Sequence, residues 1–384
     1  MPFVGLQREL DERAAHGLLR RRRTLDSPQS PHITVEGRPY LAFSSNDYLG
    51  LASHPQLVQA LQQGARQWGV GAGAAHLVNG HFAPHHQLEA ELAAFVGKPA
   101  ALLFSTGYMA NLGTVQALVG KDDTVFADKL NHASLNDAML LSRAGTKRYR
   151  HGDLAQLARM LEQTKSGRRL ILTDAVFSMD GDLAPLPELL ALCERFDAWL
   201  LVDDAHGFGV LGQQGRGSLS HFNLTSPRLI LMGTLGKAAG VSGAFVAAEQ
   251  VVIDTLVNHA RSYIYTTATP PALSVALLQS LRLIEQGDAQ RAHLRGLIAR
   301  LRKGLDDLPW EPMPSDTAIQ PLLVGDNHLA LGLSEGLRER GIWVAAIRPP
   351  TVPQGTARLR ITLSAAHTEG DVDRLTEALH ELAR

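Results

Sequence analysis

Cysteine is almost missing from this sequence. Cys193 is the only cysteine among 384 residues, so no disulfide can form within the chain. It follows an apolar run at residues 189–192, which predicts a buried thiol rather than a nucleophile. No apolar run approaches the roughly 18 residues that a membrane-spanning helix needs, and the first residues do not resemble a secretory leader. We therefore expect a cytoplasmic protein with no membrane partner.

The sequence also lacks an excess of charge of either sign. Its 37 basic and 38 acidic residues leave a formal charge of −1, so no global field favours nucleic acid, and we expect no nucleic-acid partner. One local basic run, four arginines at residues 20–23, ends a helical pattern that covers residues 3–22. Cations are favoured at a helix C-terminus, so we interpret the run in that way.

Alternation of short apolar runs with longer amphipathic stretches dominates residues 54–285. This pattern predicts an α/β domain built on a large, mostly parallel sheet. Before it, a helix and a hairpin form an N-terminal arm at residues 1–53, and after it residues 286–384 form a smaller α+β domain. The expected strands cover residues 33–35, 40–43, 101–104, 124–127, 170–173, 199–202, 229–232, 244–247, 319–323, 343–346 and 358–362, and long helices cover 187–196, 289–308 and 369–382.

Two expected strand ends carry reactive side chains. Lys237 lies in a loop of small residues after the strand at 229–232, where crowding can lower the pKa of a lysine amine. A lone Gly-Lys pair is usually a solvated loop, however. Asp203 and His206 follow the strand at 199–202, and ligands of open α/β sheets bind at such ends. A carboxylate there can pair with a protonated pyridine nitrogen. Metal binding is the alternative, but no cluster with metal-ligand spacing accompanies these two residues.

Three further segments follow strands. Ser105-Thr106-Gly107-Tyr108 opens a helix, and the free N–H groups of such a turn suit a phosphate, although ordinary capping explains the same residues. His132 can stack on an aromatic ring, or it is a surface-loop histidine. Ser178 lies in a comparable loop.

Along the chain the anion-binding turn comes first, then His132, then Asp203 and His206, and last Lys237. In this order the segments resemble the fold-type I enzymes that use pyridoxal 5′-phosphate (PLP), which share the aspartate aminotransferase fold. The resemblance covers nearly the whole chain. It implies that Lys237 forms a Schiff base with PLP, that Asp203 binds the pyridine nitrogen, and that His132 covers the ring face. It also implies that His206 contacts the phenolic oxygen, and that the ring and phosphate are surrounded by Gly107, Tyr108, Ser178 and Thr234. Lys237, His132 and Asp203 are the implied catalytic residues.

Finer motifs resemble the α-oxoamine synthases, which join an amino acid to an acyl thioester with loss of CO₂. The motifs are Asn46-Asp47-Tyr48-Leu49-Gly50-Leu51, Phe177-Ser178-Met179-Asp180-Gly181-Asp182, Ser242-Gly243-Ala244 and the arginine- and proline-rich stretch at residues 348–360. The last is similar to members that use L-alanine and a pimeloyl thioester, carried by CoA or acyl-carrier protein, in biotin biosynthesis.

The same resemblance implies a set of substrate residues. Arg360, with Asn46 beside it, corresponds to the arginine that binds the substrate carboxylate, which a planar guanidinium recognises through two hydrogen bonds. Arg20 and Thr351 fall where the family contacts the acyl substrate, and His132 would contact the amino acid. Three alternatives remain open: a ligase for glycine and acetyl-CoA (2-amino-3-ketobutyrate CoA ligase), a non-catalytic binding protein on the same fold, and, least favoured, a nicotinamide dehydrogenase.

Two last segments concern the neighbourhood of the expected site. The family's Gly/Ser-rich loop is altered here at residues 71–81, where Ala75 replaces a serine and His81 stands near a common aromatic position. Residues 265–271 are similar to the segment that reaches the neighbouring subunit's phosphate. The resemblance therefore implies a homodimer with shared active sites, in which Thr266 and Thr267 make that contact. The alternative is an ordinary turn before the helix that Pro270 and Pro271 open.

Overall fold

The computed structural model describes residues 2–165 and 167–384. The chain divides into two compact units, which interleave along the sequence. The larger unit comprises Asp47–Ser178 and Asp182–Arg291, and the smaller comprises the residues up to Asn46, Met179–Gly181 and Ala292–Arg384. The domain boundaries expected near residues 53 and 285 stay a prediction.

A seven-stranded sheet forms the centre of the larger unit, in the order β3-β9-β8-β7-β6-β4-β5. Five neighbouring strands, from β8 to β5, run parallel, and β9 runs antiparallel to both β8 and β3. The mostly parallel α/β sheet expected from the sequence is therefore confirmed. The strands are β3 (Ala100–Phe104), β4 (Thr124–Asp128), β5 (Gly145–Tyr149), β6 (Arg169–Asp174), β7 (Trp199–Asp203), β8 (Leu229–Thr234) and β9 (Ala244–Ala248).

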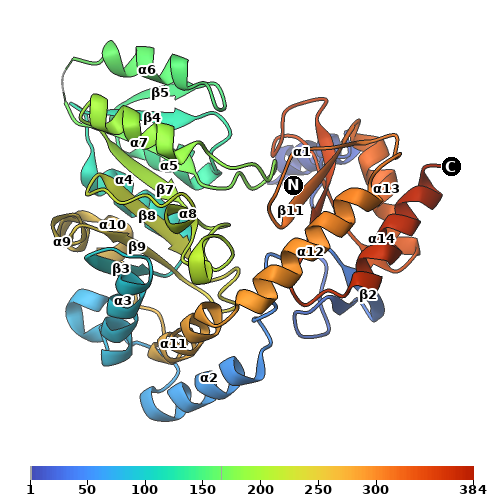
Figure 1. Cartoon of the computed structure of the whole chain (residues 1–384), viewed down its shortest axis with the longest axis horizontal. Helices are drawn as coiled ribbons and strands as arrows, with labels where there is room; N and C mark the ends of the chain where they lie inside the picture. Colours follow the sequence, from blue (N-terminus) through green and yellow to red (C-terminus); the bar gives the residue numbers. More distant parts are fainter. Residues whose placement is uncertain (1, 166) are drawn as a thin grey trace. The chain divides into compact units, whose positions relative to one another are not determined.

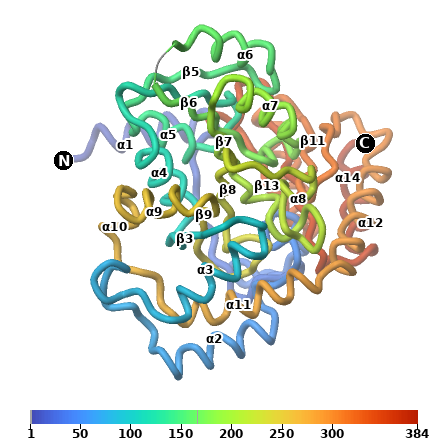
Figure 2. Tube along the Cα trace, turned by 60° about the vertical axis from the view of Figure 1, so that its left-hand side comes forward, coloured from blue at the N-terminus to red at the C-terminus, as the bar shows by residue number. Residues whose placement is uncertain are grey.

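Helices cover both faces of this sheet, with α4 and α5 on one face and α7 on the other (Figures 1 and 2). Double coverage explains why β6, β7 and β8 are nearly continuous apolar runs: their central residues are fully buried. Cys193 on α7 is buried as expected. The helices are α2 (Pro55–Trp68), α3 (Ala83–Phe95), α4 (Gly107–Leu118), α5 (Ala133–Leu141), α6 (Leu154–Glu162), α7 (Leu186–Arg195), α8 (Ser218–His221), α9 (Gln250–His259), α10 (Arg261–Ile264) and α11 (Pro271–Glu285), with a π-helical turn, η1 (His76–Gly80), and a 3₁₀ turn, η2 (Gln213–Gly215).

The smaller unit holds two small sheets. One has the order β1-β2-β12 and the other β10-β11-β14-β13. The elements are β1 (His32–Val35), β2 (Arg38–Ala42), β10 (Glu311–Pro312), β11 (Ile319–Gly325), β12 (Ile342–Trp343), β13 (Ala345–Ile347) and β14 (Ala357–Thr362), with α1 (Val4–Ala15), α12 (Asp288–Gly304, which begins in the larger unit), α13 (Asn327–Glu339) and α14 (Glu369–Leu382). The expected hairpin at residues 33–43 is the antiparallel pair β1–β2.

Two expectations for this unit were wrong. The strand expected at residues 343–346 is two strands, because Trp343 pairs with β2 whereas Ala345 pairs with β14. The first helix ends at Ala15 rather than near residue 22, because Gly17 adopts a left-handed φ of 65° and the Leu18 N–H closes the turn on the Arg13 carbonyl. The four arginines at residues 20–23 therefore do not occupy a helix C-terminus.

Among the described residues, none of the helices combines the length and the apolar character that crossing a bilayer requires.

Candidate active site

A pocket of about 200 Å³ opens in the larger unit and is lined from β6, β7 and β8 and from the segments that follow β3, β4, β6, β7 and β8. Carboxyl ends of parallel strands meet at one edge of a sheet, which explains why distant segments converge here. The structure places all of the following predicted cofactor residues around it: Gly107, Tyr108, His132, Ser178, Asp203, His206, Thr234 and Lys237.

Lys237 lies in the loop that joins β8 to β9. Its backbone is fixed because the Gly240 N–H donates to the Lys237 carbonyl (2.8 Å). The Lys237 Nζ lies 2.8 Å from His206 Nε2, and the other ring nitrogen of His206, Nδ1, lies 2.5 Å from the Tyr48 hydroxyl. In the tautomer that carries its proton on Nε2, His206 donates to the lone pair of an uncharged amine. His206 thus lies within hydrogen-bond reach of the Lys237 amine and can orient it.

Asp203, at the end of β7, is buried with both carboxylate oxygens accepting hydrogen bonds. Asn111 Nδ2 donates to Oδ2 (2.7 Å), and the Ala205 N–H donates to Oδ1 (3.0 Å). Asn111 is itself held, because it also donates to the Ser134 hydroxyl (2.8 Å). A buried carboxylate whose two oxygens are each oriented by a hydrogen-bond donor is suited to meet a cationic ring nitrogen.

A second carboxyl group, Asp174, lies at the matching position of β6, directly paired in register with Asp203. Asp174 is buried, and its Oδ2 accepts the backbone N–H of His132 (2.7 Å). Burial first, and then the charge of Asp203, raise the pKa of Asp174 well above the usual range. Asp174 therefore favours its protonated form, which makes Asp203 the better candidate for an ionic contact.

His132 caps the N-terminus of α5 and lines the pocket. Its Nδ1 lies 2.7 Å from the Ser134 hydroxyl, and Asp174 holds its backbone. Burial lowers the pKa of His132, with Lys237 adding to the effect and Asp203 opposing it. A largely neutral imidazole in a fixed orientation is suited to stack on a flat ring.

The N-terminus of α4 supplies an anion site at the same pocket. Thr106 caps the helix by accepting the Met109 N–H (3.2 Å), and Gly107 and Tyr108 form its first turn. Free backbone N–H groups at a helix start attract phosphate. Tyr108 also donates its hydroxyl proton to the carboxylate of Asp137. The pocket thus combines an amine, a carboxylate, two imidazoles and an anion site, and this donor set fits PLP.

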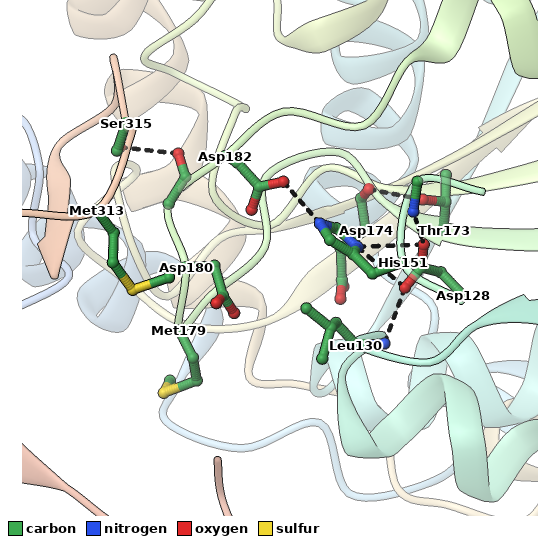
Figure 3. Close-up of polar contacts among 12 residues, drawn as sticks. Asp128, Leu130, His151, Thr173, Asp174, Met179, Asp180, Asp182, Met313 and Ser315 are labelled. Carbon is green, nitrogen blue, oxygen red and sulfur yellow. Dashed lines mark hydrogen bonds and ion pairs between the residues drawn. The ribbon is translucent and has the colours of Figure 1, made fainter. Parts of the chain in front are cut away.

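A histidine outside the pocket ties together two of the segments that line it. Figure 3 shows His151 between the carboxylates of Asp128 and Asp182. Its Nδ1 lies 3.1 Å from Asp128, which precedes the His132 segment, and its Nε2 lies 2.8 Å from Asp182, which follows the Ser178 loop. Hydrogen bonds that the ring donates to the carboxylates of Asp128 and Asp182 raise the pKa of His151 to about 10. His151 therefore acts as a cationic clamp between the two segments.

The predicted substrate residues of the smaller unit form two pairs. The buried Arg360 guanidinium donates to Asn46 Oδ1 (3.2 Å) and to the Thr362 hydroxyl (2.9 Å). Arg20 donates to the Thr351 hydroxyl (3.0 Å) across 331 positions of sequence. Each pair brings together residues that the resemblance assigned to one substrate group.

Thr266 and Thr267 are not among the residues that line the pocket. They lie between α10 and α11, where Thr266 is half-buried and Thr267 is exposed.

Sequence reasoning gave no role to four polar residues of this site: Tyr48, Asn111, Ser134 and Asp174. Asp174 ends a strand just as Asp203 does, so the same strand-end argument applies to it. Tyr48 lies within the Asn46–Leu51 motif. The sequence around Asn111 did not indicate a role in the site, because its contact with Asp203 depends on the packing of α4 against the end of β7.

Comparisons with known proteins agree with this geometry. A family model, aminotransferase class I and II, matches residues 38–379. An 8-amino-7-oxononanoate synthase from Nitrosomonas europaea is 63% identical over 385 residues, covering 100% of both chains. Another from Dechloromonas aromatica is 59% identical and covers 98% of this chain and 99% of its own.

Solved structures are also similar. A serine palmitoyltransferase of S. paucimobilis with a bound PLP–myriocin aldimine superposes with a TM-score of 0.93 at 28% identity, covering 99% of this chain and 97% of that one. An 8-amino-7-oxononanoate synthase from Francisella tularensis reaches a TM-score of 0.79 at 34% identity over 89% of this chain and 97% of that one. The chain therefore belongs to the aminotransferase class I and II family and, within it, to the 8-amino-7-oxononanoate synthases.

Proposed function

We propose that this protein condenses L-alanine with a pimeloyl thioester to give 8-amino-7-oxononanoate, CO₂ and the free thiol, a step of biotin biosynthesis. In this reaction the Cα of alanine bonds to the thioester carbonyl carbon, the thiol leaves, the alanine carboxylate leaves as CO₂, and a proton returns to Cα. The observation that carries the proposal is the shared pocket of Lys237, His206 and Asp203 in a chain that matches such synthases over its full length.

Lys237 has two tasks in this scheme. Its Nζ would hold the cofactor through the aldehyde carbon, and as a free amine it would remove the Cα proton of the amino acid and later return one. When bound, PLP supplies the electron sink for the charge that develops at Cα. His206 would orient the amine, because its Nε2 lies 2.8 Å from Nζ and the Tyr48 hydroxyl lies 2.5 Å from its other ring nitrogen.

Asp203 would hold the ring nitrogen of the cofactor and keep it protonated. Its two oxygens are already oriented by Asn111 and by the Ala205 N–H, so no reorganisation is needed as charge develops. His132 covers the ring face, with Ser134 fixing its orientation. Gly107 and Tyr108 at the start of α4 hold the phosphate, together with Ser178 and Thr234.

Arg360 binds the carboxylate of the amino acid in this proposal, with Asn46 orienting the guanidinium. Bidentate binding of a carboxylate places the Cα proton reproducibly. Arg20 and Thr351 contact the acyl substrate in the same proposal, and the hydrogen bond between their side chains agrees with a shared role.

The proposal also includes a homodimer in which Thr266 and Thr267 reach the partner's cofactor phosphate. Tyr265 is 70% exposed to solvent, with the Arg261 guanidinium over its ring. A large exposed aromatic side chain next to Thr266 agrees with a subunit interface at this place. A role for acyl-carrier protein as the thioester carrier belongs to the same proposal, and a cytoplasmic location stays a prediction.

The test compares three substrate pairs with purified, PLP-loaded protein: L-alanine with pimeloyl-CoA, L-alanine with pimeloyl-acyl-carrier protein, and glycine with acetyl-CoA. Thiol release and the mass of the product are measured for each pair. We expect product from alanine with either pimeloyl carrier and none from the Lys237→Ala variant. A preference for the glycine pair, or unchanged activity of Lys237→Ala, would overturn the proposal.

A further inference from the structure

Histidines gather at a second place in the larger unit, in and after the loop where the sequence departs from its family. His76 lies in η1, His81 follows it, and His85 and His86 lie on α3 with Glu89 one turn further on. None of these side chains lines the pocket of Lys237. The chemistry of that pocket therefore gives no reason for their arrangement.

His85 has a structural role within this group. Its Nδ1 accepts the Phe82 N–H (3.0 Å), which caps α3, and its Nε2 lies 2.9 Å from the Thr269 carbonyl. Both ring nitrogens are engaged with the backbone, so His85 offers no lone pair to a ligand.

His81, His86 and Glu89 differ from His85 in this respect. Each offers one ligand atom, and these atoms all lie within 4.8 Å of one another. His81 Nε2 lies 3.9 Å from Glu89 Oε2. Ligand atoms around a tetrahedral zinc ion with bonds of about 2.0–2.1 Å are roughly 3.3 Å apart. Small side-chain rotations would therefore bring the three ligand atoms to the spacing of a metal site. His86 and Glu89 are three residues apart on α3, so they share one face of that helix.

Hydrogen bonds from neighbouring groups already orient His81 and Glu89. His81 Nδ1 lies 2.9 Å from His76 Nδ1, so one of these two nitrogens carries the proton between them. When His81 carries it, the lone pair of His81 is on Nε2, the atom that faces Glu89. His76 is held by stacking on Tyr263, with centroids 5.0 Å apart.

Glu89 is fixed in a similar way. Its Oε1 accepts the Leu103 N–H (2.9 Å), which leaves Oε2 directed at His81. Metal-binding histidines and carboxylates in proteins characteristically have such outer partners.

The three side chains open onto a pocket of about 580 Å³, which Lys98 and Tyr263 also line. This leaves room for water as a further ligand. Two imidazoles and one carboxylate favour zinc-class transition ions over Mg²⁺ and Ca²⁺, which prefer oxygen ligands. We propose that His81, His86 and Glu89 bind a divalent transition-metal ion, with His76 as the hydrogen-bond partner of His81. The ion would link the segment after η1 to α3.

Cobalt(II) titration of tag-free, PLP-loaded full-length protein tests this site. The probe is Co²⁺ alone, followed by its visible d–d absorption and by calorimetry, with Zn²⁺ as competitor. We expect one Co²⁺ per chain, displaced by Zn²⁺ and not by Mg²⁺. His86→Ala and Glu89→Gln should each weaken binding at least about 10-fold.

His259→Ala serves as the matched control, because His259 is an exposed histidine on α9 outside the cluster, as His86 is an exposed histidine within it. It should bind Co²⁺ like the unmodified protein. Thermal unfolding without metal checks that each variant folds. Absence of stoichiometric binding to the unmodified protein, or binding that both His86→Ala and Glu89→Gln leave unchanged, would overturn the proposal.

Discussion

At the scale of single residues, the two neighbouring carboxyl groups of the site have different surroundings and therefore different protonation preferences. Each oxygen of Asp203 accepts a hydrogen bond. Burial and the neighbouring charge of Asp203 raise the pKa of Asp174, which favours its protonated form. We predict that Asp203→Asn lowers kcat about 100-fold or more, because it removes the charge that stabilises a protonated ring nitrogen. Steady-state assays of alanine condensation measure this loss. Asp174→Asn is the matched control and should lose much less, and equal losses would contradict the assignment.

A second prediction at this scale concerns Tyr48. Its hydroxyl lies 2.5 Å from His206 Nδ1, and His206 contacts Lys237 through the opposite nitrogen. Tyr48→Phe removes the group that fixes the ring, so we expect kcat to fall about 10-fold and its pH profile to shift. The KM for alanine should change little, because Tyr48 belongs to no substrate pair. A changed KM with an unshifted pH profile would point to a purely structural role.

The sequence identified these side chains unevenly. Lys237, Asp203 and His206 stand next to strong strand patterns, and the resemblance to the fold-type I enzymes assigned all three to one cofactor site. Asn111 lies inside α4, and only the packing of that helix against the sheet brings it to Asp203 and to Ser134. Local patterns contain no information about such packing.

At the scale of elements, the loop from β8 to β9 depends on Gly240. Gly240 has φ of 70°, and a Cβ there would lie 2.6 Å from the backbone carbon of Leu51. We predict that Gly240→Ala lowers the free energy of unfolding by about 1–3 kcal/mol. Urea unfolding measures the difference. Gly236→Ala in the same loop is the control, because its Cβ would meet nothing nearer than 3.9 Å. Equal effects of the two substitutions would contradict this reason.

The His151 clamp gives a prediction about pH. Its pKa is raised from 6.5 to about 10, so protonated His151 stabilises the fold fully below 6.5, and this contribution is lost as pH rises through about 10. His151→Gln should therefore be less stable than the unmodified protein near pH 6.5, and the difference should shrink toward pH 10. Urea unfolding at several pH values measures it. A difference that grows with pH would contradict the charged clamp.

Each element that the sequence missed or misplaced has its own physical cause. β5 is an edge strand with largely exposed residues, so it lacks the apolar run that identified its neighbours. The stretch at residues 343–346 is continuous in pattern but leaves one sheet for another at Val344. α1 has no buried residue, so its length depends on Gly17 rather than on packing.

At the scale of the whole molecule, the interleaving of the two units could not be predicted. Met179–Gly181 belongs to the smaller unit because Arg358 donates to Asp180 (2.9 Å) and the Ser315 hydroxyl donates to the Gly181 carbonyl (2.8 Å). These partners are more than a hundred positions away. Sequence patterns report neighbours along the chain, and such distant contacts leave no periodic signal.

The predicted homodimer with shared sites has a direct test. One chain has a mass of 41.5 kDa, and sedimentation should give about twice this value. We expect Lys237→Ala and a Thr266→Ala/Thr267→Ala double variant each to be nearly inactive. Refolding them together should restore about a quarter of the activity, because mixed dimers contain one intact site. No recovery, with mixed dimers shown to form, would contradict shared sites.

The central claim is that Lys237 holds PLP covalently at this pocket. Reduction of the PLP-loaded protein with borohydride, followed by digestion and mass spectrometry, tests it most directly. The predicted result is one stable pyridoxyl-phosphate label per chain, located on Lys237, and no label in Lys237→Ala. A label on any other lysine, or a protein that takes up no PLP, would contradict the claim.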